Sequence, residues 1–379
     1  MKRRQWLIGI LMVLMSASSS FAQGLPSGTL TGVVTHDGQG LPGVTVTVSS
    51  PALQGTRTEV TRESGEYIFP FLPPGDYTVS FVLSGFQQQT VTAKIAAAQT
   101  QRVNVALSMT AVTESITVTA SQQTVSEDQQ AALTFQQEDF VEKLPIARDM
   151  DSVVALAPGV HLTGPRSGGQ NQITISGAHS YENLFLLNGV VINENLRGQS
   201  LPLYIEDAIQ ETTIATAGIS AEYGRFAGGV VNAITKSGGN EFSGSFRTNL
   251  TNDSWVGETP LTVSRADSLN KSFEGTLGGR ILRDRLWFFA AGRSVESEVQ
   301  NQTSFTSIPF TTTNTQDRYE AKLTLSASPR HNFVGSFIGI DQATNGTYFT
   351  SAPILDTRSL VNREDPQELK ALHYNGVLT

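Results

Sequence analysis

Residues 221–236 read Ala-Glu-Tyr-Gly-Arg-Phe-Ala-Gly-Gly-Val-Val-Asn-Ala-Ile-Thr-Lys and, together with 183–190 before them, decide the fold of the central part of the chain. The earlier stretch reads Asn-Leu-Phe-Leu-Leu-Asn-Gly-Val. Its Asn188-Gly189 pair predicts a tight hairpin turn, because both residue types tolerate positive φ. Short helical signals alternate with strand signals around these stretches. Residues 134–236 are therefore expected to form an α+β domain.

The chain beyond Lys236 alternates apolar and polar side chains at period two. Residues 242–250 and 273–281 follow this pattern. The clearest case is a third stretch, in which Tyr319, Ala321, Leu323 and Leu325 alternate with Arg318, Glu320, Lys322 and Thr324. One apolar face and one charged face are typical of transmembrane β-barrel strands.

Short and long connections separate these strands. Tight turns are expected at 283–284 and 329–330. Long polar loops, which suit the cell exterior, are expected near 251–269, 299–316 and 342–369. About six strands of about ten residues are expected, whereas a plugged transporter barrel has about 22 strands. Residues 237–379 are therefore expected to be the incomplete start of a barrel.

The N-terminal part carries shorter alternating runs. Residues 44–48 and 77–81 alternate at period two, which predicts one buried face for each. Turn residues separate the runs, for example Asp37-Gly38 and the Pro-Pro-Gly sequence at 73–75. This rhythm predicts that residues 28–109 form a β-sandwich of short antiparallel strands.

Residues 1–22 have the features of a secretory signal peptide. Lys2, Arg3 and Arg4 precede an apolar run, and small residues follow up to Ala22. The apolar run is too short to span a bilayer comfortably, so cleavage after Ala22 is expected.

The composition excludes several classes of protein. The 379 residues contain no cysteine, which removes disulfides, thiolate metal sites and cysteine catalysis. The net charge of −8 disfavours nucleic acid as a partner. No cofactor is predicted.

Residues 110–133 are rich in Gln, Ser and Thr and read as a linker. Inside this linker lies an extended β-branched segment, Glu114, Ser115, Ile116, Thr117, Val118, Thr119 and Ala120. A strand of this kind can add its backbone to the edge of another sheet. A last strand of the sandwich and a structureless linker are the alternative readings.

Three resemblances to known families follow from these stretches. Residues 28–109, with Leu41-Pro42-Gly43 and the turn at 73–77, resemble the carboxypeptidase regulatory-like family, whose fold is a non-catalytic transthyretin-like or Ig-like sandwich, often described as carbohydrate-binding-like. Residues 134–236 resemble the plug domain of TonB-dependent outer-membrane receptors, with Ser176 where the family often has Arg and Asn188 where it often has Asp. The segment 114–120 resembles the TonB box. The order of these parts is similar to that of Oar-like receptors.

The plug resemblance identifies a set of motif residues. They are Gly177, Asn183, Asn188, Gly189, Tyr223, Gly224, Gly228, Gly229, Asn232, Thr235 and Lys236. The resemblance implies an outer-membrane location with a periplasmic N-terminal domain, contact with outer-membrane lipid, and TonB bound at 114–120. It also implies active uptake of a solute from outside, with siderophore, cobalamin, oligosaccharide and peptide all open.

Two other functions stay open at this point. The chain could be an exported surface-binding or adhesive envelope protein with a carbohydrate-binding-like sandwich. An enzyme is the weakest hypothesis: His179 and Glu182 have the His-x-x-Glu spacing of a zinc carboxypeptidase, but a catalytic zinc needs a third protein ligand, and no second metal-like pair accompanies them. The sequence therefore predicts no enzyme and no metal.

Overall fold

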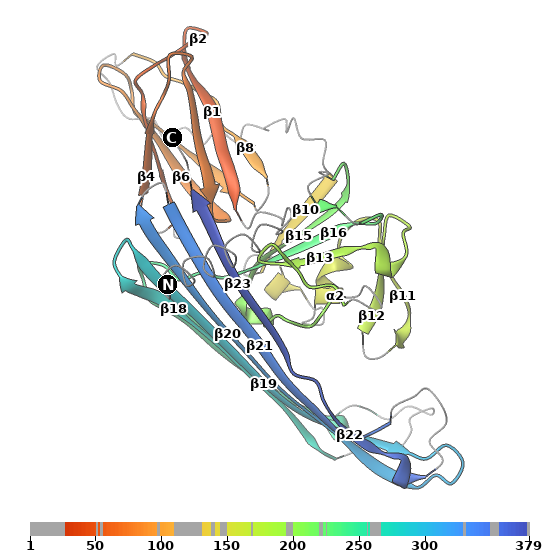
Figure 1. Ribbon diagram of the computed structural model, residues 1–379. Helices are drawn as coiled ribbons and strands as arrows, with labels where there is room; N and C mark the ends of the chain where they lie inside the picture. The colour runs from red at the N-terminus through yellow and green to blue at the C-terminus, as the bar shows by residue number, and fades with distance from the viewer. Residues whose placement is uncertain are drawn as a thin grey trace, which may run out of the picture.

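Most of the described chain is β-structure. The computed structural model describes residues 27–50, 52–53, 56–96, 99–109, 131–137, 141–144, 150–167, 170–194, 200–219, 223–224, 226–255, 257, 267–328, 331–348 and 356–376. Figure 1 shows an N-terminal sandwich (28–109), a central domain (131–236) and a sheet of long strands (243–376), here called the long-strand sheet. The mainly β fold expected from the sequence is confirmed.

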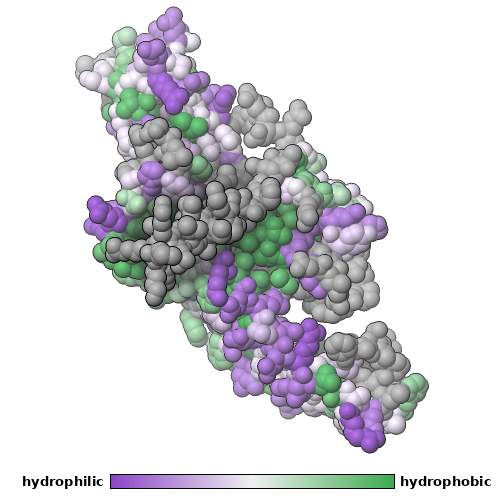
Figure 2. Space-filling view, viewed as in Figure 1, coloured by the Kyte–Doolittle hydropathy of each residue, from purple (hydrophilic) through white to green (hydrophobic). Residues whose placement is uncertain are grey.

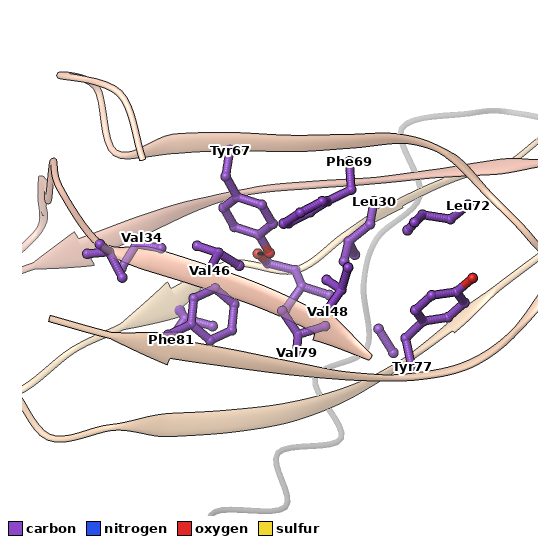
Figure 3. Packing of buried hydrophobic residues seen from close by; sticks show 14 of the residues in the cluster. Leu30, Val34, Val46, Val48, Tyr67, Phe69, Leu72, Tyr77, Val79 and Phe81 are labelled. Carbon is purple, nitrogen blue, oxygen red and sulfur yellow. Dashed lines mark hydrogen bonds between the residues drawn. The ribbon is translucent and has the colours of Figure 1, made fainter. Parts of the chain in front are cut away.

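The N-terminal sandwich consists of two facing sheets. Its strands are β1 (Gly28–His36), β2 (Gln39–Gly40), β3 (Thr45–Ser49), β4 (Thr56–Val60), β5 (Glu66–Leu72), β6 (Gly75–Val82), β7 (Gln89–Ile95), β8 (Thr100–Arg102) and β9 (Val105–Ala106). One sheet has the order β2-β1-β5, with β8 and β9 also paired to β1, and the other has the order β4-β3-β6-β7. Alternate side chains such as Leu30, Val46 and Phe81 fill the space between the sheets (Figure 3). The predicted sandwich is confirmed.

The central domain combines one mixed sheet with short helices. Its elements are β10 (Ala131–Gln136), η2 (Val141–Lys143), α2 (Met150–Val154), β11 (Val160–Ser167), β12 (Gln170–Ile175), η3 (Ser180–Glu182), β13 (Leu184–Leu187), β14 (Val190–Val191), η4 (Glu206–Ala208), β15 (Ile209–Ala217) and β16 (Val230–Thr235). The sheet order is β10-β15-β16-β13-β14, and β13 runs parallel to β16. The hairpin β11-β12 stands apart from this sheet. The α+β expectation is confirmed.

The long-strand sheet is antiparallel throughout. Its elements are β17 (Ser243–Asn252), η6 (Asp253–Trp255), β18 (Leu269–Leu282), β19 (Leu286–Gln302), β20 (Pro309–Ser328), β21 (His331–Thr347), η7 (Thr357–Ser359), β22 (Val361–Glu364) and β23 (Gln367–Gly376). The order is β17-β18-β19-β20-β21-β22, and β23 also pairs with β21.

Several boundaries differ from the sequence expectation. β19 continues to Gln302 and β20 starts at Pro309, so most of the loop expected at 299–316 is strand. β21 likewise continues to Thr347. The reason is backbone pairing, which persists in register beyond the apolar part of each strand. Residues 131–133, expected in the linker, belong to β10 and pair with β15.

The side chains of the long-strand sheet are arranged inside out relative to a soluble protein. On β20 the apolar Leu323 and Leu325 are 51% and 40% exposed, whereas Glu320 and Lys322 are 3% and 4% exposed. The apolar face predicted from period-two alternation therefore points outward, and the charged face points toward the central domain. Hydrophilic residues dominate the strand ends around β22 (Figure 2).

The three parts meet at one end of the long strands. The central domain lies against one side of the long-strand sheet, and the sandwich lies beyond the end opposite β22 (Figure 1). None of the helices in the described ranges has the length and the apolar character of a membrane-spanning segment.

Candidate functional site

The side chain of Asn183 joins the start of β13 to the segment before β16. Its Nδ2 donates to the Ile173 carbonyl at 2.7 Å, and its Oδ1 accepts from the Gly229 N–H at 3.0 Å. A Cβ on Gly228 would lie 2.1 Å from this Oδ1, so any larger residue there would displace the amide. Asn183, Gly228 and Gly229, all expected motif residues, therefore meet in space.

Asn188 forms the matching contact at the other end of the same strand pair. Its Oδ1 accepts from the Thr235 N–H at 3.0 Å, and its Nδ2 lies 3.0 Å from Thr235 Oγ1. Asn188 and Gly189 have φ angles of 50° and 79°, which gives the predicted hairpin turn between β13 and β14. The two sequence stretches are thus the two members of the parallel pair β13–β16, fastened at both ends.

The remaining expected residues lie around this pair. Asn232 is buried on β16, and the Lys236 N–H donates to the Ala208 carbonyl at 2.7 Å. Tyr223 packs against a small apolar cluster that includes Leu184 and Val230. Gly177 and Gly224 are exposed turn residues with positive φ. These residues shape the central domain and do not converge on one chemical centre.

Asn188 and Thr235 also contact the long-strand sheet. Lys322 Nζ donates to the Thr235 carbonyl at 2.8 Å and lies 3.4 Å from Asn188 Oδ1. Thr235 Oγ1 donates to Glu320 Oε1 at 2.5 Å. We call these four residues the polar anchor. All four are buried, so the hydrogen bonds form away from water, where they are stronger.

A second polar cluster, in which the carboxylates are buried and the arginines are partly buried, lies at η4, and we call it the acidic anchor. Glu206 pairs with Arg293, and Arg247 lies 2.6 Å from Asp207 Oδ1. Glu274 Oε1 accepts from the Asp207 N–H at 2.6 Å.

Arg318 completes the acidic anchor. Its Nη1 donates to the Tyr204 carbonyl at 2.6 Å and lies 3.8 Å from Glu206 Oε1. Burial raises the pKa of the Tyr204 hydroxyl, which therefore stays neutral. Glu206 and Asp207 come from the central domain, whereas Glu274 and every arginine come from the long-strand sheet.

Sequence reasoning missed both anchors. The alternation on β20 placed Arg318, Glu320 and Lys322 on one face, but no signal in the sequence paired that face with 206–207. Between residues 205 and 210 only the single helical turn η4 forms. Its two acidic residues within the otherwise apolar stretch 201–209 were the available clue.

The His179–Glu182 pair caps a single helical turn. Glu182 Oε2 accepts from the His179 N–H at 2.9 Å, and the His179 ring stacks on Tyr181. Within the described ranges, no group of three metal-ligating side chains occurs. The expected TonB contact at 114–120 and the signal peptide at 1–22 lie outside the described residues.

A cleft of about 410 Å³ opens where the three parts meet. Sandwich, central domain and long-strand sheet all contribute lining residues, among them Gly75, Gln210 and Ser245. The Gln210 Nε2 donates to the Pro74 carbonyl at 2.6 Å across this junction. The sandwich is thus in direct contact with the central domain.

Three family models match the chain in order. Residues 29–108 match the carboxypeptidase regulatory-like domain, 124–231 the TonB-dependent receptor plug domain, and 234–375 an outer membrane beta barrel domain. In the central region, the plug match covers most of the motif residues described above.

Curated relatives agree with these matches. The chain is 34% identical over 301 residues to the TonB-dependent transporter Oar of Myxococcus xanthus, covering 73% of this chain and 27% of that protein. It is 31% identical over 149 residues to the ferrienterobactin receptor of Escherichia coli, covering 35% of this chain and 20% of that protein. The chain therefore spans about a quarter of the length of the curated relatives it matches. These relatives are named as transporters and receptors, not as enzymes.

Solved structures share the fold. The ferric enterobactin receptor of Pseudomonas aeruginosa matches with a TM-score of 0.51 and 19% identity over 65% of this chain and 39% of that one. A second crystal structure of that receptor gives 0.50 and 18% over 66% and 39%. A regulatory-like sandwich, a plug and barrel strands follow one another in this chain, which lies in the outer membrane with its N-terminal region in the periplasm. The chain belongs to the TonB-dependent receptors.

Proposed function

We propose that this chain acts in a TonB-dependent receptor that takes up a solute actively from outside the cell. The central domain, hereafter the plug, closes the lumen that the long-strand sheet begins to enclose. TonB, energised by the inner-membrane proton gradient, pairs with residues 114–120 by strand addition and pulls or remodels the plug. No step in this cycle is enzymatic.

The buried polar contacts between the plug and the long-strand sheet carry this proposal. The plug is fastened to the sheet by two buried groups of charged and amide side chains, the polar anchor and the acidic anchor. When the plug moves away, each of these side chains can replace its protein partner by water. The net cost in free energy is modest, because water makes the same hydrogen bonds. When the plug moves, Lys322 and Arg293 then line an aqueous path. Apolar side chains join the plug and the sheet beside these groups, for example Ile338 and Ile340 of β21 in the plug core.

The candidate solutes belong to four classes: siderophores, oligosaccharides, peptides and cobalamin. Ferric enterobactin is the first probe, because a curated relative is named for ferrienterobactin and solved relatives are described with enterobactin bound. Oligosaccharide, peptide and cobalamin are the further probes.

Deleting residues 114–120 tests the TonB contact without knowledge of the solute. We expect loss of cross-linking between the receptor and TonB, and loss of energised uptake of any solute that binds. The control deletes residues 121–123, which lie between this segment and the start of the plug match, and should leave both intact. Full cross-linking and uptake after deletion of 114–120 would overturn the assignment. An adhesive or surface-binding protein predicts no dependence on TonB in any of these variants.

A further inference from the structure

The turn that joins β5 to β6 in the sandwich is covered by the plug. Pro74, at its tip, is buried, and its carbonyl accepts from Gln210 Nε2 at 2.6 Å. Tips of surface turns are normally exposed to solvent. A buried tip therefore indicates a docking contact between domains.

The turn is held in shape from within the sandwich. Arg57 Nη1 donates to the carbonyls of Pro70 and Phe71 at 3.0 and 3.3 Å, and the Tyr77 hydroxyl donates to the Pro73 carbonyl at 2.7 Å. Phe71 has a φ of 57°, a conformation that costs free energy unless neighbours impose it. A turn fixed on both sides can dock without losing further conformational freedom.

The docked turn lies beside the polar anchor. Phe71, Pro73 and Pro74 line a small cavity together with Asn188 and Lys322. The sandwich therefore covers the end of the anchor that faces away from β22. Excluding water there strengthens the hydrogen bonds of the anchor, because the local dielectric constant falls.

We propose that residues 70–76 of the sandwich form a latch that holds the plug in the closed receptor and must leave Gln210 before the plug can move. This proposal rests on the proposed function, since it requires a plug that TonB moves. Residues 110–130 connect the sandwich to β10. A pull on that connection acts on both domains at once, so the latch and the plug are released by the same force.

A cysteine pair tests the docked state. The 379 residues contain no cysteine, so Pro74→Cys with Gln210→Cys introduces the sole thiols among them. In the full-length receptor, any cysteine elsewhere is first replaced by serine. We expect a short bis-maleimide to join them in cells lacking TonB and to join fewer of them in energised cells. The control pair, Thr47→Cys with Thr58→Cys, lies within the sandwich, where the two Oγ1 atoms are 3.2 Å apart. Its cross-linking should not depend on TonB.

A second measurement reports how readily a reagent from solution reaches the junction beside the polar anchor. In the receptor with Thr324→Cys, a buried position at the junction, Gln210→Ala should speed labelling by maleimide about fivefold, the effect of one lost hydrogen bond. Gln136→Ala is the matched control, because Gln136 donates to Glu211 inside the plug. Equal labelling rates for Gln210→Ala and its parent would overturn the latch.

The outcomes separate the latch from the proposed function. Two outcomes would overturn the latch alone. In the first, the Pro74–Gln210 cysteine pair cross-links no more than single cysteines do. In the second, its yield does not depend on TonB although 114–120 still cross-links to TonB. If 114–120 makes no contact with TonB at all, the proposed function falls as well.

Discussion

An amide at position 188 satisfies partners that a carboxylate could not. The Asn188 amide group donates to Thr235 Oγ1 and accepts from the Thr235 N–H, so one side chain meets both polar groups of one residue. The plug family often has Asp at this position, which only accepts when ionised. Here the acceptor oxygen still lies 3.4 Å from the Lys322 ammonium. The departure from the family pattern therefore keeps the contact with the charge and adds a donor.

Asn188→Ala should lower the free energy of unfolding of the plug by about 1–3 kcal/mol, because it leaves the Thr235 N–H buried without this acceptor. Asn188→Asp keeps the acceptor and should cost less. Urea unfolding of the purified receptor measures both. Equal stability of Asn188→Ala and the parent would show that the hydrogen bonds between Asn188 and Thr235 do not stabilise the plug.

Glu206 and Arg293 should show strong coupling. Arg293→Ala leaves the buried charge of Glu206 without this partner and should cost about 3–5 kcal/mol, and Glu206→Ala, which leaves a partly buried arginine, should cost less. The double variant should cost less than the sum. Extraction of the plug from the barrel by urea provides the measurement. The control pair is Glu368–Lys370, an exposed contact of 2.8 Å, whose removal should cost about 0–1 kcal/mol. Additive losses for Glu206 and Arg293 would contradict a coupled pair.

At the scale of single elements, β20 shows what the sequence could and could not predict. Period-two alternation predicted its two faces, because strand geometry alone sends neighbours to opposite sides. Its length of 20 residues was not predicted, since polar Thr and Asn residues beyond the apolar part resemble a loop. Pairing with β19 and β21 holds them extended, and pairing between strands is not visible in one strand's sequence.

A charge on the outward face of β20 should be costly in the membrane. Leu323→Arg should destabilise the receptor folded in bilayers by about 2–4 kcal/mol, the cost of an arginine on the lipid face at the midplane. Thr311→Arg, at the exposed start of the same strand, is the control and should change it little. Folding yield into lipid vesicles against urea measures both. Equal effects at the two positions would contradict the lipid-facing assignment.

The sandwich should lose stability in alkali. Burial raises the pKa of the Tyr67 and Tyr77 hydroxyls, and Arg57 partly opposes this for Tyr77. Because the folded pKa lies above the ordinary value of 10.0, the stabilisation is complete below pH 10 and is lost as the pH rises above it. Urea midpoints measured across this range should fall, and Tyr67→Phe should reduce the slope. A urea midpoint that does not change above pH 10 would contradict the stabilisation by the neutral tyrosines.

For the whole molecule, the sequence predicted the domains but not their contacts. The order of sandwich, plug and barrel strands followed from turn residues, alternation and the resemblance at 183–190 and 221–236. Neither the acidic anchor nor the Pro74–Gln210 contact could be predicted. These contacts join residues 87 and 136 positions apart, and only packing of complete domains brings such residues together.

The topology of the molecule in the membrane can be tested with two short epitope insertions. An epitope at Gly257, between β17 and β18, should bind antibody on intact cells. An epitope at Gly85, in a sandwich turn with open space around it, should bind antibody after the outer membrane is permeabilised. Labelling of Gly85 on intact cells would place the sandwich outside and contradict a periplasmic N-terminal region.

The parallel pairing of β13 with β16 has a consequence for the order of folding. Leu184 pairs with Val230, so β13 must wait for a partner that leaves the export channel 46 residues later. The sandwich strands β3 and β4, neighbours in sequence, meet no such delay. β16 is followed closely by β17, the first long strand. The sheet of the plug is thus completed by β16, immediately before the first long strand leaves the export channel.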